Sequence, residues 1–183
     1  MIAEFMLHRT KADQVVPVYK AFLVTYPSIF KLAEANYDEV SRFTKHLGLH
    51  WRSKHMLDAA KYIVDGLNGT FPQSRSGLKK IPGVGDYISG AILTICFNEP
   101  VYVVDSNIAR FINRFFGLKL SGELRRKKKV IEIARDLFDI EHPGEFLFAI
   151  IDFTSLICTP KNSKCSNCIL LNLCRFDDKC NIR

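Results

Sequence analysis

Long hydrophobic runs are missing from this 183-residue chain. The longest, residues 146–151, is far shorter than the roughly 18 apolar residues that a membrane-spanning helix requires. Residues 1–9 also lack the basic start and apolar centre of a signal peptide. The hydrophobic fraction of 48% and the charged fraction of 25% exclude a disordered chain. The sequence therefore predicts a globular, intracellular protein of the cytoplasm or nucleoid, with no membrane partner.

Patterns typical of β-strands are equally scarce. Only residues 101–104 have the composition of a strand, and they are too few to found a sheet. Elsewhere, apolar residues recur at helical spacing. Three such stripes are Val15, Val16, Tyr19, Phe22 and Leu23; Val40, Phe43 and Leu47; and Met56, Ala59, Ala60, Ile63 and Leu67, which is ended by Asn68 and Gly69. Further helices are predicted over 74–81, 86–97, 106–116, 123–139 and 144–157. The predicted fold class is all-α.

Acidic residues are outnumbered by basic ones. Lysine and arginine total 26 and aspartate and glutamate total 19, which gives a net charge of 26 − 19 = +7. This charge suits a polyanion such as nucleic acid, although many basic proteins of this size bind none. The basic run Arg125–Lys129 lies within a helical pattern. We favour a solvated helix face for this run over a phosphate contact.

Cysteine is nearly absent before residue 158. Cys96 stands alone in an apolar segment and is expected to be a small buried hydrophobe. The others are Cys158, Cys165, Cys168, Cys174 and Cys180. The first four of these have the spacing C-x6-C-x2-C-x5-C, which suits four thiolates around a [4Fe–4S] cluster. A structural zinc is the alternative, but zinc sites usually pair two short knuckles and this segment has one. Disulfides rank last.

Residues 78–91 predict a helix, a tight turn and a second helix. Gly83 and Gly85 are expected to supply positive φ and to let another backbone approach closely. Val84 is expected to pin the turn into the core. The free N–H groups at the start of the second helix can hold a phosphate. The candidate DNA contacts here are Lys79, Lys80, Gly83, Val84 and Gly85.

Asp105 precedes the amphipathic helix that begins near residue 106. It is well placed to be the N-cap of that helix. A carboxylate at a helix mouth could also face a sugar and stabilise positive charge at its anomeric carbon. The residues alone leave both interpretations open.

The hairpin, the segment 103–107 and the cysteine loop, in this order, resemble the helix-hairpin-helix DNA glycosylases of the endonuclease III and MutY branch. The resemblance extends from Glu4 to Cys180. It implies a helical barrel lobe over 16–117, a cluster lobe over 118–183 and a start of chain, 1–15, that packs with the cluster lobe. It also implies a [4Fe–4S] cluster held by the first four tail cysteines, a monovalent cation at the hairpin, and a monomer that binds double-stranded DNA containing a mismatch.

The resemblance assigns catalysis to Asp105, which stabilises an oxocarbenium-like transition state. Bifunctional members carry a Schiff-base lysine at the position of Tyr87, 18 residues before Asp105. A phenol cannot form a Schiff base, so a monofunctional glycosylase is expected. Glu4 falls where MutY-type enzymes have the glutamate that protonates the leaving base; otherwise it is an ordinary surface residue.

Substrate assignment follows from the same resemblance. A tyrosine at the position of Tyr87 resembles the Mig-type thymine-DNA glycosylases, which act on T:G and U:G mismatches. Some MutY-type enzymes also have a tyrosine there. The chain stops nine residues after Cys174, which favours thymine, because MutY-type enzymes continue into a domain that reads 8-oxoguanine. The alternatives are an adenine glycosylase lacking that domain and an inactive DNA-binding module. Family members usually have a further helix before the Glu4 segment, and only three residues precede Glu4 here, so we expect either that the helix is absent or that the start of the chain is truncated.

The remaining DNA contacts are implied by position in the family. His8 corresponds to a residue that fills the gap left by the flipped base, and Leu49 to the wedge beside the estranged base. The alternative interpretations are that His8 is an ordinary surface histidine and that Leu49 packs in the core. Lys161 and Lys164, in the cysteine loop, are expected to face phosphates.

Overall fold

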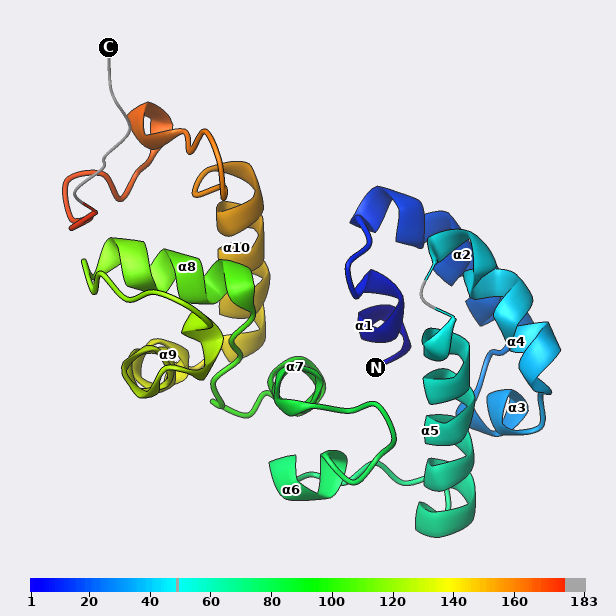
Figure 1. Ribbon diagram of the computed structural model, residues 1–183. Helices are drawn as coiled ribbons and strands as arrows, with labels where there is room; N and C mark the ends of the chain where they lie inside the picture. Colours follow the sequence, from blue (N-terminus) through cyan, green and yellow to red (C-terminus); the bar gives the residue numbers. More distant parts are fainter. Residues whose placement is uncertain (49, 177–183) are drawn as a thin grey trace. The chain divides into compact units, whose positions relative to one another are not determined.

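The computed structural model describes residues 1–48 and 50–176, and every regular element within them is a helix (Figure 1). The predicted all-α class is thereby confirmed. No described helix has both the length and the apolar character needed to cross a membrane. The chain forms two compact units, Met1–Ser89 and Gly90–Arg183. The lobes predicted from the resemblance divide later, at residue 117, and that division stays a prediction.

The first unit is arranged around the long helix α5. Its elements are α1 (Ile2–Leu7), α2 (Ala12–Thr25), α3 (Ile29–Ala33), α4 (Tyr37–Thr44), the 3-10 turn η1 (Lys45–Leu47), α5 (Trp51–Leu67) and α6 (Arg75–Leu78). Helices α1, α3 and α4 pack against α5. Four residues of the predicted α5 stripe are fully buried: Met56, Ala59, Ala60 and Ile63. The helix ends, as expected, where Asn68 and Gly69 take left-handed backbone conformations.

The second unit is arranged around α8. Helix α7 (Asp86–Phe97) begins in the first unit and continues into this one. The others are α8 (Ser106–Phe115), the 3-10 turn η2 (Leu124–Arg126), α9 (Lys128–Phe138), α10 (Pro143–Leu156) and the 3-10 turn η3 (Cys165–Asn167). Helices α9 and α10 and the turn η2 all pack against α8. Because α8 contacts each of them, its own position within the unit is fixed, and so are the positions of the residues at its two ends.

Two predicted helices are shorter or broken in the structure. Helix α6 spans only Arg75–Leu78 of the predicted 74–81, because Pro82 disfavours helical backbone at the residue before it. The predicted helix 123–139 breaks at Lys127, whose backbone is extended. Like charges repel at helical spacing, and the break places the basic run at a turn where Glu123 pairs with Arg125 and Arg126.

Three further expectations are corrected. Residues 101–104 form no strand, since the helices around them offer no pairing partner. Cys96 is exposed rather than buried, because it lies near the end of α7 on the side away from the core. In the first stripe only Val15 and Phe22 are buried, whereas Val16 and Leu23 are 47% and 42% exposed.

Candidate functional site

The turn between α6 and α7 is built on one left-handed glycine. Gly83 has φ = +78°, and a Cβ placed on it would lie 2.8 Å from the Cγ and Nδ1 atoms of His55. Val84 is 5% exposed and its N–H donates to the carbonyl of Ile81 at 3.0 Å. The expected conformation of Gly83 and burial of Val84 are confirmed. The turn thus requires a residue with no side chain where it meets α5.

Gly85 differs from expectation. Its φ is not positive, and a Cβ on it would meet no atom within 4 Å. Its carbonyl accepts from the Ser89 N–H at 3.0 Å, so Gly85 directly precedes α7 and accepts a hydrogen bond from its first turn. Among the described residues, the N–H groups of Gly83 and Gly85 have no backbone acceptor. Both groups can therefore donate to a bound anion.

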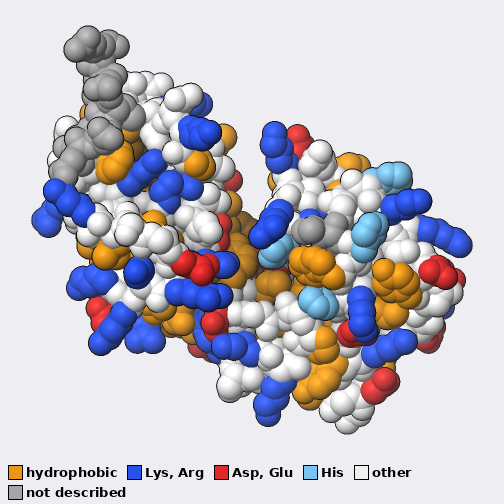
Figure 2. Space-filling view, viewed as in Figure 1, with side chains coloured by type: hydrophobic (Ala, Val, Ile, Leu, Met, Phe, Trp, Pro, Cys, Tyr) orange, Lys and Arg blue, Asp and Glu red, His pale blue; other side chains and the backbone are white. Residues whose placement is uncertain are grey.

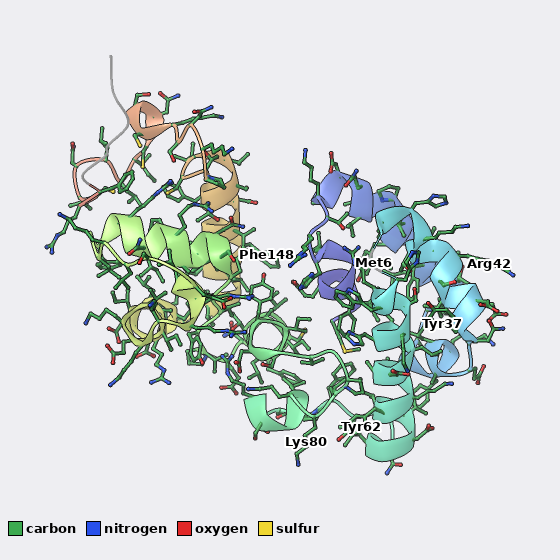
Figure 3. All side chains as sticks on the ribbon, viewed as in Figure 1. Met6, Tyr37, Arg42, Tyr62, Lys80 and Phe148 are labelled. Carbon is green, nitrogen blue, oxygen red and sulfur yellow. The ribbon has the colours of Figure 1, made fainter. Side chains whose placement is uncertain are left out.

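The hairpin lysines differ in their partners. Lys79 Nζ lies 2.7 Å from Asp86 Oδ1, and these side chains are 45% and 65% exposed. Lys80, two residues beyond the end of α6 (Figure 3), is exposed and makes no ion pair with any described residue. Exposed ion pairs stabilise a fold by about 0–1 kcal/mol, so an incoming phosphate can compete for Lys79 at little cost.

Replacing Gly83 with Ala is expected to lower the free energy of unfolding by about 1–3 kcal/mol, because it adds left-handed strain and a contact with His55. Gly85→Ala is the matched control, since its Cβ meets nothing within 4 Å and its φ is not positive. Urea denaturation of both variants checks this. Equal losses in the two variants would contradict the role given to Gly83.

Asp105 caps α8. Its Oδ1 accepts from the backbone N–H groups of Asn107 at 2.8 Å and Ile108 at 2.7 Å. Its Oδ2 accepts from Asn107 Nδ2 at 3.1 Å. The predicted N-cap is confirmed. Since Asp105 is half-buried and held by three hydrogen bonds, its carboxylate has a fixed direction.

A half-buried arginine continues this network to the cysteine loop. Arg110 Nη1 donates to Asn107 Oδ1 at 2.7 Å, and Arg110 Nη2 donates to the carbonyls of Thr154 at 3.0 Å and Cys158 at 2.9 Å. Burial lowers the pKa of Arg110. Hydrogen bonds therefore run without a break from the Asp105 carboxylate to the first cysteine of the loop.

One turn further along α8, Arg114 holds the loop itself. Its Nη1 donates to the Thr159 carbonyl at 2.7 Å and to Ser163 Oγ at 2.9 Å, and its Nη2 donates to the Pro160 carbonyl at 3.2 Å. The candidate contacts Lys161 and Lys164 are exposed on this loop. The loop between α10 and η3 is thus shaped by α8.

The four candidate ligands, Cys158, Cys165, Cys168 and Cys174, line one pocket, together with Phe111, Phe115 and Phe153. Cys158, Cys168 and Cys174 are free thiols, whereas Cys165 is disulfide-bonded. As arranged, no group of three or more His, Cys, Asp or Glu in residues 1–48 and 50–176 could hold a metal ion. The residues fit a sulfur-ligated cluster in type and in sharing one pocket, and the cluster stays a prediction.

The other predicted site residues belong to the first unit. Glu4 is half-buried on α1, His8 is exposed just after it, and Tyr87 is half-buried in the first turn of α7. The His8 ring meets Trp51 edge-on, with ring centroids 5.2 Å apart. Leu49 lies outside the described residues. The first unit therefore carries the hairpin and these side chains, and the second carries Asp105 and the cysteines.

Sequence reasoning missed the arginines that hold these segments. Arg110 and Arg114 lie four residues apart in an amphipathic helix, a spacing that places both on one face and could have indicated a shared partner. Arg52, which is completely buried on α5, left no comparable signal, because a lone arginine in a helix is normally read as exposed.

Known proteins provide the comparison. A thymine/uracil-DNA glycosylase of Pyrobaculum aerophilum is 36% identical over 98% of this chain and 80% of its own length. An adenine DNA glycosylase of Buchnera aphidicola is 32% identical over 95% of this chain, which spans 49% of that protein. The solved structure of a thermostable thymine-DNA glycosylase superposes with a TM-score of 0.86 at 29% identity, covering 98% of this chain and 83% of that one.

The hairpin and the α8 segment both lie within a single family match. Residues 2–139 match the family described as HhH-GPD superfamily base excision DNA repair protein. That range exceeds half of the 183 residues. The chain therefore belongs to the HhH-GPD superfamily of base excision DNA repair proteins.

Proposed function

We propose that this chain is a monofunctional DNA glycosylase that hydrolyses the N-glycosidic bond of thymine or uracil mispaired with guanine. The observation that carries the proposal is the Asp105 carboxylate, held at the mouth of α8 by three hydrogen bonds. Similarity to the Pyrobaculum thymine/uracil-DNA glycosylase over 98% of the chain supports the substrate. The target base leaves the duplex first, which costs a few kcal/mol and least at a mismatch.

Asp105 supplies the charge for the reaction. As the bond between C1′ and the base nitrogen breaks, its electron pair leaves with the base and positive charge develops on the sugar. A carboxylate whose direction is already fixed stabilises that charge without reorganisation. Water then bonds to C1′ and gives up a proton, and the departing base gains one. Glu4 is proposed to contact or protonate the leaving base.

Tyr87 decides between hydrolysis and strand cleavage. Strand cleavage through a Schiff base requires an amine, and a phenol offers none. The product is therefore an intact strand with an abasic site. Tyr87 instead lines the pocket of the flipped base or packs on the flipped nucleotide.

The hairpin is proposed to hold a DNA phosphate. The N–H groups of Gly83 and Gly85 and the ammonium groups of Lys79 and Lys80 are its donors, and buried Val84 pins the turn. A monovalent cation at the turn belongs to the same proposal. Lys161 and Lys164 meet phosphates from the cysteine loop, and the enzyme acts as a monomer.

A [4Fe–4S] cluster is proposed for the cysteine loop. Cys158, Cys165, Cys168 and Cys174 would hold it, since they line one pocket. Binding would require all four cysteines, Cys165 included, as thiolates. The cluster's role is structural: it would hold the loop in shape, while Arg110 and Arg114 join that loop to α8.

Adenine removal is the second candidate. Glu4 and the 32% identity with the Buchnera adenine DNA glycosylase favour it. A DNA-binding module without activity is the third, and the geometry of Asp105 speaks against it.

Base release from end-labelled duplexes tests these proposals. With T:G, U:G, A:G and A:8-oxoguanine pairs, we expect strand cleavage at thymine and uracil only after alkali treatment, because an abasic site resists cleavage until it is heated with base. Cleavage at adenine alone would move the assignment to adenine. Cleavage without alkali would contradict the monofunctional mechanism, and no cleavage at all would favour the binding module.

A further inference from the structure

Arg52 is a charged residue buried completely in the first unit. Its relative exposure is 0%, and it is the largest of the fully buried side chains. Nη1 donates to the Met6 carbonyl at 2.9 Å, and Nη2 donates to the His8 carbonyl and to Thr10 Oγ1, the latter at 2.7 Å. Figure 3 labels Met6 beside α1. The three acceptors are uncharged oxygens of one short segment.

This arrangement carries a large cost. Burying a cation without an opposite charge costs several kcal/mol even after relaxation. Burial lowers the pKa of Arg52, and its Nε finds no hydrogen-bond partner among the described residues. A methionine would fill much of the same volume without that penalty. The retained charge therefore points to a task that an apolar side chain cannot perform.

The segment that Arg52 holds has no regular structure of its own. It follows α1, and Arg9 within it takes a left-handed backbone with φ = 59°, which is unfavourable for a residue with a side chain. One backbone hydrogen bond closes it, from the Thr10 N–H to the Leu7 carbonyl at 3.1 Å. The Arg52 guanidinium adds two bonds to this segment, at the His8 carbonyl and at Thr10 Oγ1, and a third to Met6 near the end of α1, so it determines where residues 8–10 lie.

The side chain of His8 is held from the same helix turn. The His8 ring lies edge-on to the Trp51 ring, with an interplanar angle of 82°. The centroid of the Trp51 ring lies 5.0 Å from that of the His55 ring. Trp51 is 39% exposed and His8 is exposed, so the row of His8, Trp51 and His55 rings reaches solvent. Figure 2 shows histidine side chains beside hydrophobic ones on this unit's surface. Arg52 fixes the backbone of His8 while its neighbour Trp51 contacts the ring.

We propose that Arg52 is a positioning residue that presents His8 to the DNA duplex. This rests on the proposed function and on the role that the family resemblance implies for His8, which is to fill the gap left by the flipped base. A preorganised His8 would enter that gap without first ordering its loop, which avoids about 1–2 kcal/mol of backbone entropy for each residue ordered.

A double-mutant cycle under single-turnover conditions on a T:G duplex tests this. Arg52→Met and His8→Ala are each expected to slow base release about tenfold, which corresponds to ~1.4 kcal/mol. Because both changes remove the same contribution, the double variant should be no slower than His8→Ala. Arg52→Lys, which keeps the charge and can reach one carbonyl, should recover part of the rate.

The matched control is Ser53→Ala. Ser53 is also fully buried and adjacent on α5, but its hydroxyl bonds to Thr44 rather than to the loop. It should lower stability with little effect on the rate, and the small effect should add to that of His8→Ala. Amide hydrogen exchange of residues 8–10 should accelerate in Arg52→Met and not in Ser53→Ala. Additive rates for Arg52→Met and His8→Ala, or unchanged exchange, would overturn the proposal.

Two further measurements keep the test decisive. If Arg52→Met does not fold, Thr10→Val removes one of the three bonds alone and should show a smaller, equally non-additive effect. If the wild-type chain releases no thymine, the proposed substrate fails, and the same cycle is measured on the dissociation constant for a duplex with an abasic site. Coupling there would support the role of Arg52, and additivity would reject it.

Discussion

Asp105→Asn is expected to slow base release by on the order of 10³, the scale observed when one preorganised electrostatic group is removed from an active site. The substitution removes the negative charge and the acceptor of the Asn107 Nδ2 bond, because an amide NH2 group cannot accept. Asn and Asp are about equally good N-caps, so the bonds to the Asn107 and Ile108 N–H groups can persist through the amide oxygen. Single-turnover base release on a T:G duplex measures the rate, and a gel-shift titration should show binding retained.

The same substitution separates the two interpretations of this residue. If Asp105 only caps α8, Asp105→Asn should keep nearly full activity, whereas Asp105→Ala should lose about 0.5–2 kcal/mol of stability and lose activity only through that instability. If Asp105 acts in the reaction, both variants should lose activity although Asn keeps the fold. Undiminished turnover in Asp105→Asn would remove Asp105 from the mechanism.

Arg110→Met is expected to lower the free energy of unfolding by about 1–3 kcal/mol, the range for leaving hydrogen-bonding groups without their partner. The carbonyls of Thr154 and Cys158 and the Asn107 amide oxygen would each lose their donor. Asn107 would then be free to turn, and the Oδ2 atom of Asp105 would lose its fixed hydrogen bond. Base release should therefore fall at temperatures where the variant is still folded. Chemical denaturation and single-turnover rates below the unfolding transition test both parts.

Arg135→Met is the matched control for Arg110→Met. The Arg135 side chain is exposed on α9, and its guanidinium lies 5.4 Å from the centroid of the Tyr102 ring. A cation–π contact at an exposed site contributes about 0.5–1 kcal/mol, so a small loss and unchanged catalysis are expected. If the two variants lost equal stability, the hydrogen bonds that Arg110 makes between Asn107 and Cys158 would contribute no more to stability than an exposed contact does.

Several features of this protein could be predicted because their causes are local. The stripe Met56–Ile63 faces the core since helical periodicity needs only a nearby apolar partner. Asp105 caps α8 because a short acidic side chain before an amphipathic helix can reach the free N–H groups two and three residues on. Gly83 takes a left-handed backbone at the turn, which glycine adopts at the least steric cost.

Other features escaped prediction because long-range packing decides them. Gly85 has no left-handed backbone since the start of α7 needs none. Cys96 is exposed because the side of α7 that the core covers does not include it. The basic run Arg125–Lys129 lies at a helix break, where Glu123 pairs with two of its members. Composition alone would have allowed the opposite outcome in each case.

By itself, the sequence determined an all-helical chain with a glycine turn, a capped helix beginning at Asp105 and a cysteine-rich tail, because periodicity, capping and turn chemistry act over a few residues. Only the tertiary structure decided the partners of Arg52 and Arg110. The acceptors of Arg52 lie 42–46 residues away in the sequence. Those of Arg110 lie 44–48 residues away, apart from the nearby Asn107. Each guanidinium donates to whichever carbonyls the fold brings within reach, and no local pattern specifies which those are.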